Sequence, residues 1–249
     1  MMQKPQRLIP AAALDSGFPA VCVVPAAGSG VRLGAGVPKP SRKIGGLPIA
    51  VRTLRMLLRS WKFEEVFMPV EPTRIAATQR LLSRHGLSGV RVIAGGRTRS
   101  ESVRNAFGQV RPGKKVVLIH DVARPFLDSR HVREVLRMAR KKRAALLAQR
   151  STATVKQTSG AAPVVLRTLD RRCIYLAQTP QAFSYRLLQA GYAKNDWRPE
   201  RFTDEAGMAE AAGFKVWLVE GPSSNIKITT PADLCLAKAL LKAGANALK

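Results

Sequence analysis

Cysteine is scarce in this sequence, with only Cys22, Cys173 and Cys235 among 249 residues. They show no metal-ligand spacing and an odd number cannot pair completely, which argues against a disulfide scaffold and a structural zinc site. We therefore expect a protein of the reducing cytoplasm. Long hydrophobic runs are also missing: no stretch approaches the about 18–20 apolar residues of a membrane-spanning helix, which excludes a membrane span.

Acidic residues are few, with 16 Asp and Glu against 42 Lys and Arg, so the formal net charge is +26. Such a balance attracts polyanions such as nucleotides, phosphorylated metabolites, nucleic acid or an anionic membrane surface. A general excess of cations over solvated faces is the alternative, because the cations are not gathered into one block. Aromatic residues are only 6 % and no RNA- or DNA-binding motif is visible, which disfavours a nucleic-acid-binding protein.

The sequence is 46 % hydrophobic, enough for a sizeable core, and its length fits one large domain. Residues 1–19 are predicted to form a flexible leader. Their apolar run at 8–14 contains Pro10 and is followed by Asp15, which makes a poor signal peptide, while an organellar targeting leader stays open. Residues 20–249 are predicted to form the single domain.

Strand-like and helix-like segments alternate along the first part of this domain. Strands are predicted at 20–24, 65–70, 90–94, 115–120 and 144–148, and helices at 47–61, 73–85, 98–107 and 129–142. Apolar strands that alternate with amphipathic helices are typical of a mostly parallel sheet covered on both faces. The predicted fold class is therefore α/β, with a mostly parallel, Rossmann-like sheet.

Residues 149–177 break this alternation, because β-forming residues flank a turn signal at Ser159–Gly160. This segment is predicted to be a protruding β-hairpin arm. The remaining segments are predicted to be helices at 184–192 and 204–212, strands at 215–219 and 225–228, and a last helix after the N-cap Thr230.

A glycine-rich loop follows the first strand and carries Gly28, Gly30, Arg32 and, further on, Lys39. Glycine lets backbone N–H groups approach a phosphate, and the two cations supply charge beside it. The loop lacks the early helix and the acidic residue of a dinucleotide fold, and it lacks the Walker pattern. A purely structural loop is the alternative.

A second group of polar residues, from His120 to Arg124, follows a buried strand, at the edge where open α/β sheets bind ligands. Asp121 suits a Mg²⁺ ion, which prefers one or two carboxylates together with substrate phosphates. A helix N-cap or an ion pair with Arg124 is the alternative. His120 is predicted to be a packed core histidine.

With these residues in place, the chain resembles the 2-C-methyl-D-erythritol 4-phosphate cytidylyltransferases of the non-mevalonate isoprenoid pathway. Six blocks in the family's order carry the resemblance: Pro25 to Leu33 with Pro38-Lys39, Gly95-Gly96 with Arg99 and Ser102-Val103, His120 to Pro125, Asp170-Arg171 with Gln178 to Gln181, Thr203 to Ala206, and Asn225 to Thr229. The resemblance implies a nucleotidyltransferase sheet and a Mg²⁺-dependent transfer of CMP from CTP to the methylerythritol phosphate, with release of pyrophosphate.

The resemblance also implies the site residues. Catalytic contacts to the triphosphate fall on Arg32, Lys39 and Lys227, and the metal on Asp121. The nucleotide would be held by Ala26, Ala27, Gly28, Gly30, Gly95, Gly96 and Ser102, and the acceptor phosphate by Arg124, Thr154 and Arg171. The arm would pair with that of a second subunit in a homodimer, so that Thr154 and Arg171 serve the neighbour's site. For Lys227, a solvated edge lysine is the alternative.

Several positions depart from the family's pattern. Pro40 stands where glutamine is usual and removes a backbone donor. Ala153 replaces an aspartate before Thr154, and Arg97 replaces an acidic or small residue beside the expected cytidine pocket. Val122 replaces an alanine, a change also compatible with the related ribitol 5-phosphate cytidylyltransferases, so ribitol 5-phosphate is the alternative acceptor.

Overall fold

The computed structural model describes residues 17–28, 38–160, 163–194 and 201–244. Within these ranges, no helix is both long and apolar enough to cross a lipid bilayer.

A seven-stranded sheet runs through the centre of the molecule in the order β11-β7-β10-β6-β1-β4-β5. Its strands are β1 Ala20–Val23, β4 Glu65–Val70, β5 Arg91–Ala94, β6 Val116–Ile119, β7 Ala144–Arg150, β10 Tyr175–Ser184 and β11 Trp217–Glu220. Neighbouring strands pair in parallel, except that β10 lies antiparallel to both β6 and β7. The predicted mostly parallel sheet is confirmed.

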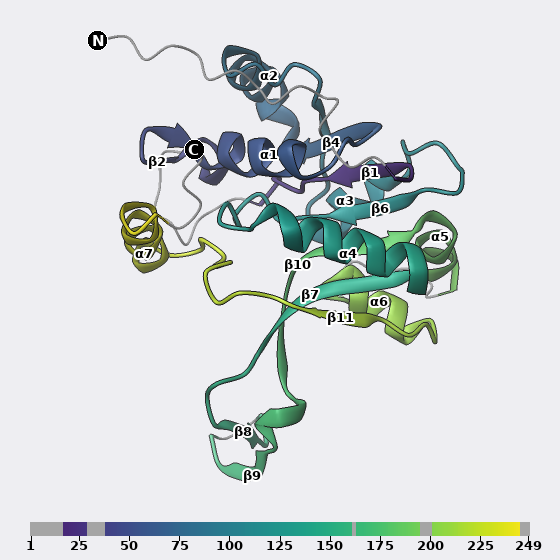
Figure 1. The fold of residues 1–249 in the computed structure, drawn as a ribbon, viewed down its shortest axis with the longest axis vertical. Helices are drawn as coiled ribbons and strands as arrows, with labels where there is room; N and C mark the ends of the chain where they lie inside the picture. Colours follow the sequence, from purple (N-terminus) through teal and green to yellow (C-terminus); the bar gives the residue numbers. More distant parts are fainter. Residues whose placement is uncertain (1–16, 29–37, 161–162, 195–200, 245–249) are drawn as a thin grey trace.

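Helices cover both faces of this sheet (Figure 1). On one face lie α1 Ile49–Ser60, α2 Ile75–Arg84 and α4 Ser129–Lys142; on the other lie α3 Arg99–Phe107, α5 Tyr185–Lys194 and α6 Glu205–Ala211. Strand β1 shows why two cores form: Cys22 faces the first and Val21 and Val23 face the second, as alternation along a strand requires. The predicted α/β fold class is therefore confirmed.

The last helix, α7 Pro231–Lys242, packs beside the short strands β2 Lys43–Ile44 and β3 Leu47–Pro48. Thr230 caps it by accepting a hydrogen bond from the backbone of Asp233, whose carboxylate bonds back to the N-cap, as the sequence pattern predicted.

Two predictions between residues 175 and 228 are wrong. The sequence analysis assigned residues 175–177 to the arm and predicted no strand at 178–183, whereas all of them belong to the long strand β10. Its buried polar side chains, Gln178, Thr179 and Gln181, hide the apolar pattern of a central strand. Residues 225–228 form no strand: Ile228 donates one backbone hydrogen bond to Ala123 instead of joining a ladder.

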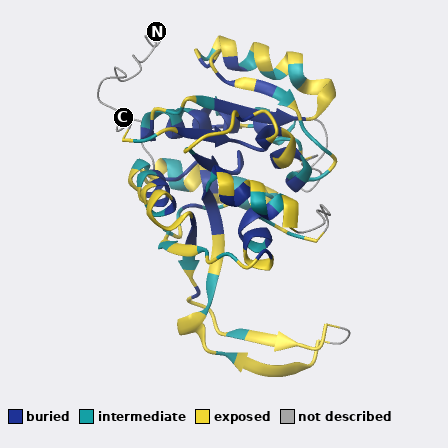
Figure 2. Ribbon diagram, turned by 90° about the vertical axis from the view of Figure 1, so that its right-hand side faces the viewer, coloured by how far each residue is buried: buried dark blue, intermediate teal, exposed yellow. Residues whose placement is uncertain are grey.

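The predicted arm is present as a hairpin of β8 Val155–Thr158 and β9 Val165–Leu169, which form their own two-stranded sheet. It extends away from the body and is exposed along most of its length (Figure 2). Val164, Val165 and Leu166 are each more than half exposed, at 62 %, 53 % and 60 %. The arm thus buries little of its own apolar surface.

The described end of the predicted leader is attached to the body. The ring of Phe18 packs on Trp61, with 4.8 Å between centroids, and Arg140 lies over the same ring. Phe18 therefore packs against the body, whereas residues 1–16 lie outside the described ranges and the predicted leader stays a prediction.

Candidate active site

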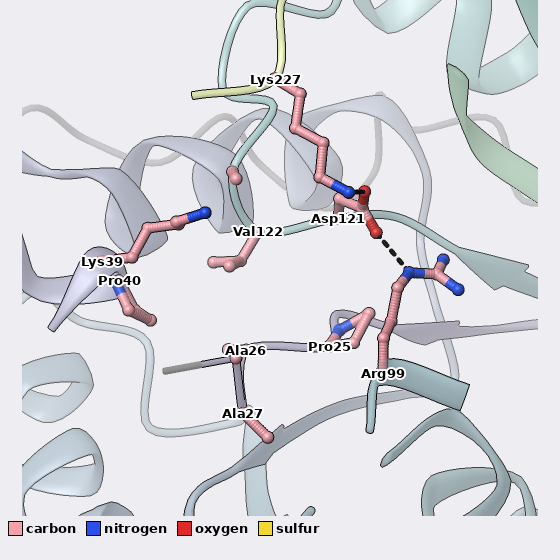
Figure 3. Close-up of a pocket in the computed structure, with 11 residues that line it drawn as sticks. Pro25, Ala26, Ala27, Lys39, Pro40, Arg99, Asp121, Val122 and Lys227 are labelled. Atoms are coloured by element: carbon pink, nitrogen blue, oxygen red, sulfur yellow. Dashed lines mark hydrogen bonds and ion pairs between the residues drawn. The ribbon is translucent and has the colours of Figure 1, made fainter. Parts of the chain in front are cut away.

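A cavity of about 210 Å³ opens where β1 and β6 end. Figure 3 shows its lining, which comes from the loop after β1, the turn at Lys39, the start of α3, the loop after β6 and the segment before α7. The lining residues are Pro25, Ala26, Ala27, Gly28, Lys39, Pro40, Arg99, Asp121, Val122, Ala123 and Lys227. The structure thus brings together Lys39, Asp121 and Lys227, which are far apart in sequence.

Asp121 divides its two carboxylate oxygens between two cations. Oδ1 accepts a hydrogen bond from Arg99 Nε at 2.8 Å, and Oδ2 lies 2.7 Å from Lys227 Nζ. Its backbone N–H donates to the hydroxyl of Thr179 at 3.0 Å. Burial raises the pKa of Asp121, but Arg99 and Lys227 together lower it well below its usual range. Asp121 is therefore ionised.

Arg99 and Glu205 are the functional candidates that the sequence analysis missed. Arg99 Nη1 donates to both oxygens of Glu205, at 3.1 and 2.9 Å, so that one guanidinium bridges two carboxylates. Burial raises the pKa of Glu205, and the charge of Arg99 opposes that rise. Both residues lie inside the matching blocks, but their spacing of 106 positions gives no local sign that they meet.

His120 is a core histidine, as predicted, and it is fully buried. Its Nε2 lies 2.9 Å from the carbonyl of Arg124 and its Nδ1 3.2 Å from the hydroxyl of Thr179. A carbonyl can only accept, so Nε2 carries the proton and Nδ1 accepts from Thr179. Burial lowers the pKa of His120 to about 4, which keeps the ring neutral near pH 7.

Lys227 lies on an irregular segment that is fastened to the loop after β6. Ile228 N donates to Ala123 O at 2.9 Å, and Arg124 Nη1 donates to Asn225 O at 2.7 Å. The buried Asn225 side chain donates to Gln178 Oε1 and Thr179 O. Arg124 thus holds the backbone that carries Lys227 and does not line the cavity; its contact with an acceptor phosphate stays a prediction.

Gly95 and Gly96 allow the start of α3 to approach the loop after β1. A Cβ on Gly95 would lie 2.6 Å from the Cβ of Ala27, and one on Gly96 would overlap the Cβ of Glu101. Ser102 Oγ accepts from Gly96 N at 3.0 Å and donates to Thr98 O at 2.8 Å. Packing therefore requires these glycines, and their contact with a nucleotide stays a prediction.

Four predicted site residues remain: Gly30, Arg32, Thr154 and Arg171. Gly30 and Arg32 fall outside the described ranges. Thr154 precedes β8, and Arg171 begins the 3₁₀ turn Arg171–Cys173, where its Nη1 donates to Thr152 O at 2.9 Å. Neither Thr154 nor Arg171 lines the cavity of its own chain, so their service to a neighbour's site stays a prediction.

Two of the departures from the family's pattern border this region. Pro40 is buried and lines the cavity within the 3₁₀ turn Lys39–Ser41. Arg97 donates its backbone N–H to Glu101 Oε2 at 2.6 Å, while its side chain extends into solvent. Glu101 thus places a carboxylate beside Arg97, at the start of α3.

The cavity offers a cation one protein carboxylate. Across the described ranges, no group of three or more His, Cys, Asp and Glu side chains could hold a metal ion. A closed structural metal site is therefore absent from these ranges, and Asp121 supplies the carboxylate in the cavity lining that could share an ion with a bound anion.

Comparisons with known proteins identify the family of this chain. Residues 20–243 match the model of the 2-C-methyl-D-erythritol 4-phosphate cytidylyltransferase family. The enzyme of that name from Syntrophus aciditrophicus is 38 % identical over 224 residues, covering 89 % of this chain and 95 % of the relative. That from Frankia casuarinae is 40 % identical over 220 residues, covering 88 % and 80 %.

Solved structures show the same fold. The 4-diphosphocytidyl-2C-methyl-D-erythritol synthase of Anaerococcus prevotii superposes with a TM-score of 0.80 at 29 % identity, covering 91 % of this chain and 97 % of that one. The 2-C-methyl-D-erythritol 4-phosphate cytidylyltransferase of Francisella tularensis gives 0.74 at 31 % identity, covering 89 % and 99 %. The chain is an enzyme, a nucleotidyltransferase, and it belongs to the 2-C-methyl-D-erythritol 4-phosphate cytidylyltransferase family.

Proposed function

We propose that this enzyme transfers CMP from CTP to 2-C-methyl-D-erythritol 4-phosphate, giving 4-diphosphocytidyl-2-C-methyl-D-erythritol and pyrophosphate. Beside the family membership, one observation carries the proposal: Lys39, Asp121 and Lys227 converge on one cavity from three separate segments. Two cations and a carboxylate in one cavity are what a magnesium-bound triphosphate requires.

The reaction requires stabilisation of negative charge, and it does not require the removal of a proton. An oxygen of the acceptor phosphate attacks the α-phosphorus of CTP in line with the bond to pyrophosphate, which breaks. That oxygen is already ionised near neutral pH, so no general base is needed. His120 does not line the cavity and is held neutral by burial, which fits this chemistry. Lys39 and Lys227 are placed to stabilise the charge that develops on the phosphates.

Asp121 is the residue that would hold Mg²⁺. Its carboxylate is ionised, lines the cavity and has lone pairs beyond the two ion pairs it makes, so its chemistry fits a hard cation. When bound, Mg²⁺ offsets the charge of the triphosphate and of the leaving pyrophosphate. Lys227 would release Oδ2 of Asp121 and turn to the phosphates.

The loop after β1 is suited to the nucleotide. Gly28 has no atom within 4 Å of the place where a Cβ would stand, so its backbone is open to a ligand. Ala26 and Ala27 line the cavity, and Ala27 lies against the turn at Gly95. Gly96, Ser102, Gly30 and Arg32 complete the proposed nucleotide site.

A homodimer through the arm completes the proposed site for the acceptor. The arm carries Thr154 and Arg171, which do not line the cavity of their own chain, and it exposes apolar side chains that a second arm could cover. The free Cys22, Cys173 and Cys235 agree with the reducing cytoplasm in which we place this enzyme.

Pyrophosphate release with CTP tests the acceptor. The full chain is incubated with Mg²⁺, CTP and either 2-C-methyl-D-erythritol 4-phosphate or ribitol 5-phosphate, with CTP alone as the control. We expect release with the methylerythritol phosphate at least about tenfold faster than with the ribitol phosphate. The reverse preference would point to ribitol 5-phosphate, the alternative acceptor with which Val122 is compatible. No release with either acceptor would overturn the proposal.

A further inference from the structure

We propose that Arg99 and Glu205 are positioning residues that hold Asp121 in a fixed orientation and preserve its negative charge for the cation. This inference rests on the proposed function, since it concerns the carboxylate that would hold Mg²⁺. Neither residue was among the predicted site residues, and Glu205 does not line the cavity.

Arg99 lines the cavity, but its guanidinium is turned toward the two carboxylates. Its Nε faces Asp121, while its other two nitrogens point away from Lys39 and the cavity (Figure 3). Nη1 reaches Glu205 instead, through bonds of 3.1 and 2.9 Å. We therefore expect Arg99 to act on substrate through Asp121, although its side chain forms part of the cavity wall. Because Arg99 fixes Oδ1 of Asp121, Oδ2 is the oxygen that can exchange Lys227 for the cation.

The charges explain why a second carboxylate is needed. Side chains of Asp121 and Glu205 are only 8 % and 3 % exposed, and that of Arg99 is 24 % exposed. An Arg99–Asp121 pair alone would be neutral and would attract a cation weakly. With Glu205 ionised the trio carries one net negative charge once Lys227 has released Oδ2, so Asp121 then attracts a cation while it stays fixed.

Glu205 is itself held firmly. It begins α6, whose first turn is tied to β10 by Gln181: Nε2 donates to Asp204 Oδ2 at 2.7 Å, and Oε1 accepts from Ala206 N at 3.1 Å. The orientation of Asp121 thus depends on α3, α6 and β10 together. A carboxylate that is anchored on three elements is preorganised for its ligand.

The test compares Glu205→Gln with Glu210→Gln, which removes the same charge from an exposed position of α6. Mn²⁺ binding to the full chain with saturating CTP, without acceptor, is followed by electron paramagnetic resonance, and thermal melting checks the fold. We expect the Mn²⁺ dissociation constant to rise about tenfold in Glu205→Gln and to stay at the wild-type value in Glu210→Gln. Wild-type binding by folded Glu205→Gln would overturn the inference.

Arg99→Lys supplies a second test, because it keeps the buried cation but lacks the planar fork that bonds two carboxylates at once. At saturating metal we expect kcat to fall at least about tenfold while KM for CTP changes less than about twofold. An unchanged kcat would also overturn the inference. Failure of the proposed function would look different: the wild-type enzyme itself would show no metal-dependent transfer.

Discussion

Asp121 is the residue on which the proposed chemistry depends most. Its carboxylate is buried yet ionised, because Arg99 and Lys227 outweigh the cost of burial. Asparagine has nearly the same shape but neither the charge nor the second acceptor oxygen. The role of Asp121 can therefore be separated from its contribution to packing.

We predict that Asp121→Asn keeps the fold but lowers turnover at least about 100-fold, because the cation loses its protein ligand. Pyrophosphate release measures the rate, and circular dichroism checks the fold. In the parent enzyme, EDTA should abolish activity and added Mg²⁺ should restore it. A folded Asp121→Asn enzyme with wild-type turnover would contradict the assignment of the metal ligand.

Lys227 occupies Oδ2 of Asp121, at 2.7 Å, where the proposed cation would bind. We predict that Lys227→Ala binds Mn²⁺ at least about tenfold more tightly than wild type in the absence of CTP, because a competing positive charge has gone. Lys39→Ala is the matched control, since Lys39 faces Asp121 from the other side of the cavity (Figure 3).

Both lysine variants should lower kcat more than they weaken CTP binding, since the charge they stabilise grows in the transition state. Titration with Mn²⁺ and steady-state kinetics separate the two effects. Equal Mn²⁺ affinity in wild type and Lys227→Ala would show that Lys227 does not compete with the cation.

His120 makes the stability of the fold depend on pH. Its pKa in the folded state is about 4, below the ordinary value of 6.5, so the unfolded chain binds the proton first as pH falls. The contribution of His120 to the free energy of unfolding is therefore fully present above about pH 6.5 and falls as the pH decreases toward about 4. The loss is at most about 3 kcal/mol. Urea unfolding of wild type and His120→Gln at pH 7 and pH 5 isolates this contribution. Equal losses in both proteins would contradict it.

At the scale of elements, residues 225–228 show how an irregular segment can place the side chain of Lys227, for which we propose a catalytic role. No ladder holds them; hydrogen bonds from Ile228, Arg124 and Asn225 fasten them to the loop after β6 and to β10. Asn225 is fully buried, so its amide replaces the hydrogen bonds that a strand would have made.

We predict that Asn225→Ala lowers the free energy of unfolding by about 2 kcal/mol, because the acceptors on Gln178 and Thr179 lose their partner. It should also lower kcat, because Lys227 is no longer held in place. Ser223→Ala, an exposed change in the same segment, is the control. Equal stability and turnover in both variants would show that Asn225 does not fasten the segment.

At the scale of the whole molecule, the arm and the net charge of +26 act against each other in the proposed dimer. A lone two-stranded hairpin is marginally stable in water, so the exposed arm needs a surface to cover it. Two copies of this chain repel, but salt screens such repulsion beyond about 8 Å at physiological ionic strength. Contact between the apolar parts of two arms should therefore prevail. The charge by itself does not support a nucleic-acid-binding role for this enzyme.

We predict that Lys39→Ala and Arg171→Ala, each inactive alone, regain part of the activity when mixed. In a mixed dimer one site has both Lys39 and the partner's Arg171 intact. Light scattering measures the assembly, and pyrophosphate release measures the recovery. A monomer, or no recovery between subunits shown to exchange, would contradict the shared site.

The sequence by itself determined the layers of the fold and the edge at which the site lies. Side-chain period is a local property, so the strands of the central sheet and the helices up to residue 148, including the boundaries of α4, followed from pattern alone, whereas the short strands β2 and β3 did not. Loops that leave parallel strands share one edge of a sheet, so Asp121 and the loop after β1 were expected to meet. The glycine-rich loop already pointed to Lys39, and the matching blocks added Lys227.

The tertiary structure alone decided which polar groups are buried together. Strand β10 and the structure around Asn225 could not be predicted from the sequence, because their polar side chains form hydrogen bonds with residues far away in the chain. The bridge from Arg99 to Asp121 and Glu205 joins positions 22 and 106 residues apart. A buried charge is stable only beside its partner, and no local pattern of residues records where the fold will place that partner.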